Sequence, residues 1–222
     1  MDLLAIRYFP GLLIALIAVF TAREYVTVKE RFPLKYIFTP MVTAIIAGFV
    51  MLCIAEDGVS PYRMLVLTAL ISSLVADTML MVVEVDLMKQ GILFFLLAHV
   101  LYIAAFSLTY EYRTWNMAVA AVLCLLLAIF YRGIWGVAGT MRVPIMIYAA
   151  VLCTMLFFAL SCLNLEVTRK EALIVAGAVL FVMSDFLLAY LSFIRPHRYE
   201  SVIVWAVYAP GQFLIALSCF SC

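Results

Sequence analysis

Two aspartates lie inside two long apolar segments of the sequence. Asp77 falls within LTALISSLVADTMLMVV, and Asp185 falls within AGAVLFVMSDFLLAYLSF. An ionised carboxylate is costly in a hydrocarbon environment, so acidic residues are rare there and mark functional sites by default. Two carboxyl groups that share an apolar site divide the work of acid–base chemistry, because one holds a proton while the other accepts one. Asp77 and Asp185 are therefore the candidate catalytic pair.

A small polar residue accompanies each aspartate. Ser73 lies one helical turn before Asp77, and Ser184 immediately precedes Asp185. A serine one turn away can hydrogen-bond the carboxyl group, but a small residue also allows two membrane helices to approach closely. Both interpretations of Ser73 remain open from the sequence.

The apolar segment after Asp77 places a histidine and a tyrosine on one helical face. Phe95, His99, Tyr102 and Phe106 follow one another at helical spacing. Aromatic residues at this spacing usually indicate packing, whereas a histidine in the middle of an apolar segment favours a role in a site.

Two later segments carry further polar side chains. Tyr208 and Gln212 share a helical face, with Pro210 and Gly211 between them. Tyr148 follows Pro144 by one turn, and its hydroxyl needs a partner inside a membrane, although a structural contact would also satisfy it.

Several common catalytic motifs are absent from the sequence. It contains no G-x-S-x-G, no H-E-x-x-H and no glycine-rich phosphate-binding loop. Most of the six cysteines lie in apolar segments, the one C-x-x-C is Cys219–Cys222, and the chain has two histidines. We therefore expect no metal site and no organic cofactor.

The composition is typical of a membrane protein. Of the 222 residues, 68% are hydrophobic and 12% are charged, and the mean hydropathy is +1.20. The net charge of +1 gives no basic surface for nucleic acid.

A membrane-spanning helix needs about 20 mostly apolar residues. The sequence predicts an all-α bundle of eight transmembrane helices in one domain over residues 1–222: Leu4–Ala22, Tyr36–Ala55, Arg63–Val83, Gly91–Leu108, Thr114–Tyr131, Val143–Leu163, Ala172–Phe193 and Ser201–Phe220.

The distribution of basic residues predicts the orientation. Nine of the fourteen Lys and Arg residues, among them Arg23 and Lys35, fall in the loops after the first, third, fifth and seventh spans. By the positive-inside rule both termini then lie outside the cytoplasm. No N-x-[ST] sequon is present, which favours a bacterial inner membrane over the alternative, the endoplasmic reticulum membrane.

The two halves of the chain resemble each other. Thr39-Pro40 opens the second span as Val143-Pro144 opens the sixth, and Asp77 and Asp185 occupy corresponding places in the third and seventh. Because each half holds four spans, residues 1–110 and 111–222 would form a parallel repeat. The aspartates would then be symmetry mates at one depth.

These residues resemble the YhhN family of membrane proteins, the lysoplasmalogenases. The matching positions in the first half are Ser73, Asp77, Leu80, Gly91, Phe95, Ala98, His99, Tyr102 and Phe106. Those in the second half are Gly177, Ala178, Phe181, Ser184, Asp185, Leu188, Ala189, Tyr208, Gln212 and Ile215. Two positions depart from the family pattern: Ala76 replaces a glycine, and Thr39-Pro40 replaces Lys-Pro, with Lys35 one turn earlier.

The resemblance implies hydrolysis of the vinyl-ether bond of lysoplasmalogen, a lysophospholipid held in the bilayer. Such chemistry needs a general acid, a carboxylate and a base for water, and the two aspartates supply an acid/base pair. The residues expected to bind or orient substrate and water are Ser73, His99, Tyr102, Tyr148, Ser184, Tyr208 and Gln212. The headgroup preference, the oligomeric state and which aspartate is the acid stay open.

Two other functions are alternatives for a membrane protein with these residues. A proton-coupled transporter of small molecules or lipids also uses intramembrane carboxylates, and helices broken beyond Pro210-Gly211 would favour it. A structural or interaction protein would account for the apolar surface, but it would leave two buried acids unexplained.

Overall fold

The chain folds into a bundle of eight α-helices. The computed structural model describes residues 6–82, 87–136, 139, 142–164 and 166–221, and within these ranges it contains helices and no strand. The helices are α1 (Phe9–Val28), α2 (Phe32–Asp57), α3 (Pro61–Met81), α4 (Met88–Ser107), α5 (Thr114–Ile134), α6 (Arg142–Ser161), α7 (Arg169–Phe193) and α8 (Glu200–Ser218), followed by the short 3-10 helix η3 (Cys219–Ser221). All eight are long and apolar enough to cross a membrane. The predicted fold class is confirmed, and the chain is a multi-pass membrane protein.

One predicted loop is wrong. The segment between the first two spans was expected to be a loop holding Arg23 and Lys35, but α1 continues to Val28 and α2 begins at Phe32. Arg23 is helical and fully buried. The prediction failed because a hydropathy window ends a span at its first charged residue, whereas a buried charge is tolerated where other side chains pair with it. The predicted ends at Leu4 and Val83 lie outside the described residues.

Local sequence explains where several helices begin and end. Proline occupies the first turn of α1, α2 and α3, where its missing N–H is not needed. Ser60 caps α3 by accepting a hydrogen bond from the Arg63 amide, and Thr168 and Glu171 form a capping box at α7. Gly58 ends α2 with φ of 84°, a conformation that favours glycine.

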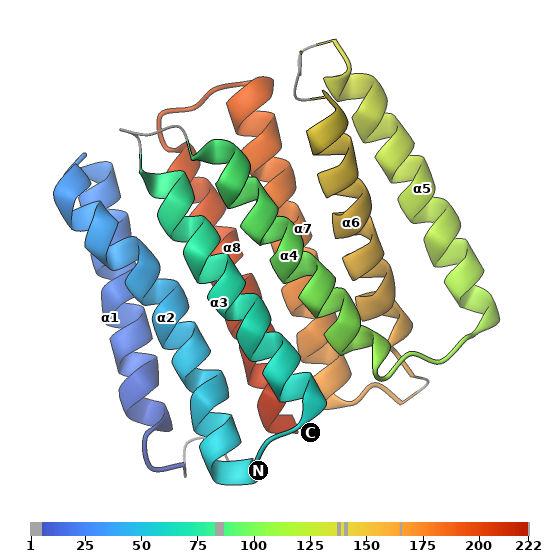
Figure 1. Cartoon of the computed structure of the whole chain (residues 1–222), viewed down its shortest axis with the longest axis horizontal. Helices are drawn as coiled ribbons and strands as arrows, with labels where there is room; N and C mark the ends of the chain where they lie inside the picture. Colours follow the sequence, from blue (N-terminus) through green and yellow to red (C-terminus); the bar gives the residue numbers. More distant parts are fainter. Residues whose placement is uncertain (1–5, 83–86, 137–138, 140–141, 165, 222) are drawn as a thin grey trace.

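The helices lie side by side, with α1 and α5 at opposite edges (Figure 1). Helices α1, α3, α5 and α7 finish at the end drawn uppermost in Figure 1, which we call the upper end. Between the two halves of the chain, α2 packs on α8 and α4 packs on α6. A parallel repeat would produce this exchange of partners, and the repeat stays a prediction.

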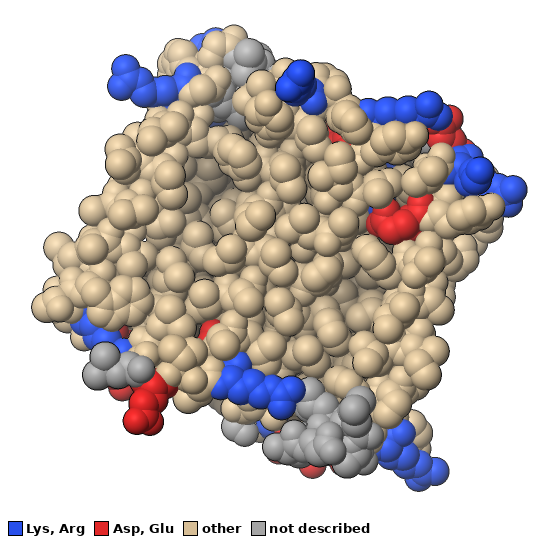
Figure 2. All heavy atoms as spheres, turned by 180° about the vertical axis from the view of Figure 1, so that it is seen from behind, with Lys and Arg blue, Asp and Glu red and all other residues tan. Residues whose placement is uncertain are grey.

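Charge is confined largely to the two ends of the bundle. On the face shown in Figure 2, acidic and basic side chains gather along the upper and lower rims, and an uncharged band lies between them. One acidic patch on the α1 side is set inward from the upper rim. The uncharged band is the surface expected for contact with lipid.

Helices α7 and α8 cross closely at two glycines. A Cβ atom on Gly177 would lie 2.6 Å from Cγ1 of Ile215 and 2.8 Å from the carbonyl oxygen of Gly211. Both distances are shorter than real contacts, and the second atom is backbone, which cannot move aside. Small residues let membrane helices approach in this way, and here the crossing holds α8 against the helix that carries Asp185.

We expect Gly177→Ala to destabilise the protein by about 1–3 kcal/mol, because the added methyl group overpacks the α7–α8 crossing. Gly11→Ala in α1 is the matched control, since nothing lies within 4 Å of a Cβ placed there. Thermal unfolding in detergent measures both variants, and an unchanged melting temperature for Gly177→Ala would contradict the close crossing.

Candidate active site

A large cavity opens within the bundle and receives residues from all eight helices. Its volume is about 1380 Å³, above the roughly 300–1000 Å³ typical of small-molecule sites. Its walls are mainly apolar, and both Asp77 and Asp185 line it. Two carboxyl groups that are 108 positions apart in the sequence therefore face one space.

Asp77 on α3 is held by hydroxyl groups from two other helices. Its side chain is buried, and its Oδ2 accepts a hydrogen bond of 2.6 Å from Thr43 Oγ1 on α2. The same oxygen accepts a second bond, of 3.0 Å, from the Tyr208 hydroxyl on α8. Two donors compensate much of the solvation that this carboxyl group loses on burial.

The hydrogen-bond network continues from Tyr208 to α4. Gln212 Nε2 donates to the Tyr208 hydroxyl at 3.0 Å, and the Tyr102 hydroxyl donates to Gln212 Oε1 at 2.5 Å. Tyr102 and Gln212 are fully buried. The chain of donors fixes the direction of the Tyr208 hydroxyl toward Asp77, because Tyr208 accepts from Gln212 and has its one proton left to donate.

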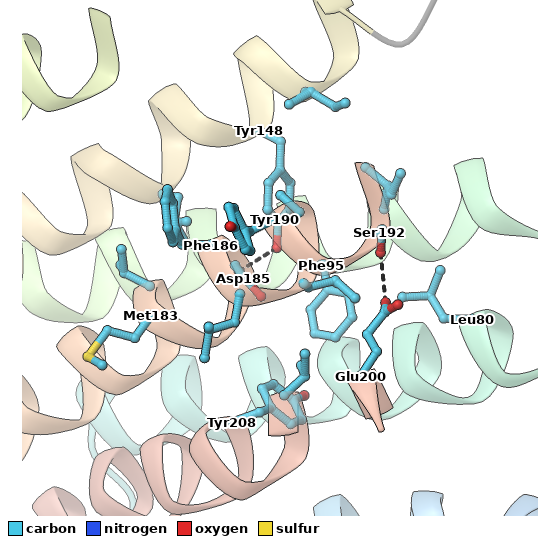
Figure 3. A pocket seen from close by; sticks show the side chains of 18 of the residues that line it. Leu80, Phe95, Tyr148, Met183, Asp185, Phe186, Tyr190, Ser192, Glu200 and Tyr208 are labelled. Carbon is cyan, nitrogen blue, oxygen red and sulfur yellow. Dashed lines mark hydrogen bonds between the residues drawn. The ribbon is translucent and has the colours of Figure 1, made fainter. Parts of the chain in front are cut away.

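Asp185 on α7 is held in a similar way by α6 and α4. The Tyr148 hydroxyl donates to Asp185 Oδ2 at 2.7 Å, and Figure 3 shows these two side chains pointing toward one another. Nε2 of His99 lies 3.5 Å from the same oxygen. Asp185 therefore receives a hydroxyl group from the helix before it and a ring from the other half of the chain, as Asp77 does.

The contacts of His99 constrain where protons reside. Its Nδ1 lies 2.5 Å from the carbonyl oxygen of Phe95, and a carbonyl only accepts, so Nδ1 carries a proton. Nε2 then faces a carboxyl oxygen of Asp185. Because two lone pairs repel, the favourable arrangement places one further proton on either Nε2 or the carboxyl group.

Aromatic rings pack the space around the two carboxyl groups. Phe181 on α7 is fully buried, and its ring meets His99 at 4.8 Å and Tyr208 at 5.3 Å between centroids, edge to face. Phe95 packs on the same ring. Phe181 thus packs against both the His99 ring and the Tyr208 ring and holds them in place.

A family model described as the YhhN family matches residues 34–219. The chain belongs to the YhhN family. No curated protein and no solved structure matches it. The matched region contains both aspartates with all the partners described above, whereas Arg23 lies before it.

The predicted site residues of this YhhN protein fall into three groups, according to whether they line the cavity, lie behind its wall or make no contact with the aspartates through a hydrogen bond. Tyr148 and Tyr208 line the cavity with the aspartates. Gln212 bonds Tyr208 and is itself bonded by Tyr102, while His99 approaches Asp185 with Nε2 at 3.5 Å without forming a hydrogen bond to a described residue. Ser73 Oγ has no hydrogen-bond partner within the described ranges, and Ser184 Oγ donates to the Phe181 carbonyl on its own helix at 2.7 Å. Neither serine bonds an aspartate, which favours the packing interpretation of Ser73.

Sequence reasoning missed two residues that belong to this site. Thr43 donates to Asp77, and one feature of the sequence could have indicated it: Thr43 follows Pro40 by three positions, much as Tyr148 follows Pro144 by four. Arg23 lines the cavity although it was placed in a loop. No group of three or more His, Cys, Asp or Glu side chains gathers in the described part of the chain as a metal site requires. Independence from metals stays a prediction.

Proposed function

We propose that this YhhN protein hydrolyses the vinyl-ether bond of lysoplasmalogen to a fatty aldehyde and a glycerophospho-alcohol. The observation that carries the proposal is that two carboxyl groups line one apolar cavity large enough for a lipid chain. Family membership supports it, because the YhhN family includes lysoplasmalogenases. No organic cofactor is needed for this reaction.

The chemistry requires a proton donor, a stabilising anion and a proton acceptor. Protonation of the outer vinyl carbon gives an oxocarbenium ion at the carbon bound to oxygen. Water adds to that carbon and loses a proton, which leaves a hemiacetal. The hemiacetal hydroxyl then loses its proton while the carbon–oxygen bond to glycerol breaks and the glycerol oxygen takes up a proton, so aldehyde and alcohol are released. Glycosidases divide a related reaction between two carboxyl groups.

The geometry favours Asp185 with His99 as the proton donor. Because His99 Nε2 and a carboxyl oxygen of Asp185 face one another, one proton shared by the two groups removes the repulsion between their lone pairs. Asp185 also lines the cavity in which we place the substrate. Tyr148 fixes the carboxyl group from the opposite side at 2.7 Å. Asp185 is thus a positioned acid with a reservoir behind it.

Asp77 is the better candidate for the ionised partner. It accepts hydrogen bonds from Thr43 and Tyr208. Hydrogen-bond donors stabilise the anionic form of a carboxyl group. Asp77 would therefore face the oxocarbenium ion as an anion and take the proton from the attacking water.

Apolar cavity walls fit the lipid tail. Leu123, Leu126 and Phe130 of α5 and Phe186 and Tyr190 of α7 line the part of the cavity away from α1. Phe186 and Tyr190 are drawn beside Asp185 in Figure 3. A carrier was the alternative, and broken helices would have favoured it. Within the described residues, α2 continues through Pro40 and α8 continues through Pro210 without a break.

We expect Asp77→Asn and Asp185→Asn each to lower aldehyde release from lysoplasmalogen at least about a thousandfold, because each removes a group that transfers a proton. Glu111→Gln is the control, since Glu111 is 75% exposed at the lower end of the bundle. Purified protein in detergent, checked for an unchanged elution volume, provides the assay. Full activity in either aspartate variant would refute the catalytic pair.

Chemical rescue tests the division of roles. In Asp185→Ala a small carboxylic acid replaces the proton donor, so rescue by formate buffer should rise as pH falls and the protonated form becomes more abundant. In Asp77→Ala the anion replaces the carboxylate, so rescue should rise with pH. Aldehyde release at fixed total formate measures both, and the reverse pattern would assign the roles the other way.

The upper end of the bundle is the proposed cytoplasmic end, in a bacterial inner membrane. By the helix bounds of the structure, four Lys and Arg residues lie in the connections at this end: Lys29, Arg31, Arg195 and Arg198. Two, Arg7 and Arg113, lie outside the helices at the other end. The positive-inside rule still places both termini outside the cytoplasm. Alkaline phosphatase fused after the last residue should therefore be active, and a fusion in the α1–α2 connection should be inactive; the opposite result would invert the orientation.

A further inference from the structure

A second polar cluster lines the cavity at its upper end. It consists of Arg23 on α1 and of Lys35 and Thr39 on α2. None of these three residues takes part in the proton transfers proposed above. All three face the same space as Asp77 and Asp185.

Lys35 and Thr39 continue a polar stripe that ends at the catalytic pair. Lys35, Thr39 and Thr43 follow at intervals of four residues, so they share one face of α2. Thr43 at the inner end donates to Asp77. Thr39 is 3% exposed, and its hydroxyl oxygen has no hydrogen-bond partner among the residues described. The stripe therefore offers an unused donor one turn from the Asp77 contact.

Arg23 is fixed in place but retains an unused donor. Its Nη1 contacts Glu24 Oε1 at 2.7 Å, its Nη2 donates to Ser201 Oγ at 2.5 Å, and its guanidinium lies 4.5 Å from the centre of the Trp205 ring. The side chain is completely buried, yet Nε has no hydrogen-bond partner in the described ranges. A buried arginine held this firmly, with one N–H that bonds no described residue, is suited to bind an anion.

Two acids lie near the cluster, and Lys35 is paired with neither. Glu24 forms an ion pair with Arg23 and does not line the cavity, whereas Glu200 lines the cavity and accepts a hydrogen bond of 2.7 Å from Ser192. Lys35 has no ion-pair partner within the described part of the chain. Arg198, which pairs with Glu30, also lines the cavity.

We propose that Arg23, Lys35 and Thr39 bind the phosphate ester of the lysolipid substrate. The proposal rests on the proposed function, since it places the headgroup phosphate of the same lipid whose vinyl ether reaches Asp77 and Asp185. Arg23 Nε–H and the Thr39 hydroxyl donate to phosphate oxygens, and Lys35 supplies a point charge.

Side-chain contacts connect the proposed phosphate site to Asp77. The Trp205 ring under Arg23 meets the Tyr208 ring edge to face at 5.0 Å, and Tyr208 donates to Asp77. A phosphate bound at Arg23 is therefore held beside the carboxylate, and the glycerol carbons between phosphate and vinyl ether set the remaining distance.

Ligand-dependent thermal stability tests the subsite without turnover. In detergent, acyl lysophosphatidylethanolamine should raise the melting temperature more than monoacylglycerol with the same chain, because it alone carries phosphate. Lys35→Gln should abolish this difference, and so should the double variant Arg23→Met/Glu24→Gln, which removes an ion pair as a unit. Lys29→Gln, an exposed lysine at the same end, is the matched control and should retain it. Retention of the difference in Lys35→Gln would overturn the proposal.

A second arm separates lipid phosphate from free phosphate. Inorganic phosphate at millimolar concentration should not reproduce the stabilisation, because it lacks the chain that fills the apolar wall. Equal stabilisation by inorganic phosphate in the wild type would overturn the assignment to a lipid headgroup.

Turnover gives the third arm. The ratio of kcat/KM for lysoplasmalogen to that for the phosphate-free alkenylglycerol should fall about tenfold in Lys35→Gln. An unchanged ratio would refute the subsite. If the wild type releases no aldehyde from either substrate, the proposed hydrolysis fails, and the melting-temperature difference still decides whether phosphate binds at Lys35.

Discussion

Two carboxyl groups buried in an apolar bundle must find hydrogen-bond donors, and that requirement organises this molecule. No donor to Asp77 or Asp185 comes from the helix that carries it: Thr43 and Tyr208 reach Asp77 from α2 and α8, and Tyr148 reaches Asp185 from α6. The helices must therefore converge on α3 and α7 before the acids are satisfied. The close α7–α8 crossing at Gly177 and Gly211 brings the last of these helices within reach.

The two acids occupy equivalent places but have different partners. Each takes a hydroxyl group from the preceding helix, one turn beyond a proline, and each faces a polar ring from the last helix of the other half. The neighbours of Asp77 are Thr43 and Tyr208, and both donate hydrogen bonds to it. Gln212 in turn donates to Tyr208. On the Asp185 side the neighbours are a tyrosine and His99, which can store a proton. A symmetric pair of acids would share one proton without direction, whereas the proposed mechanism uses this difference in partners to place the proton on the Asp185 side.

The sequence was sufficient for the number and place of the helices and for the joint site of the aspartates, because hydropathy and rare intramembrane acids are local signals. It was insufficient for Thr43, because a threonine in an apolar helix normally bonds its own backbone and only the fold brings it to Asp77. It was misleading for Arg23, whose burial depends on Ser201 and Trp205, far along the chain. For Ser73 the sequence left two interpretations open: a shared helical face allowed a hydrogen bond to Asp77, but the Ser73 hydroxyl bonds no described residue.

The cavity has a polar upper end and apolar walls beyond the acids, and this polarity bears on how a lipid would be selected. An acyl chain can slide along an apolar wall with little change in free energy, so the wall cannot fix which bond of the lipid meets Asp185. A phosphate held by Arg23 and Lys35 is directional and cannot slide. The bound headgroup would then fix the position of the lipid along the cavity, and the short glycerol segment would bring the first bonds of the chain to the acids. Such a site would accept chains of different length while acting on one bond.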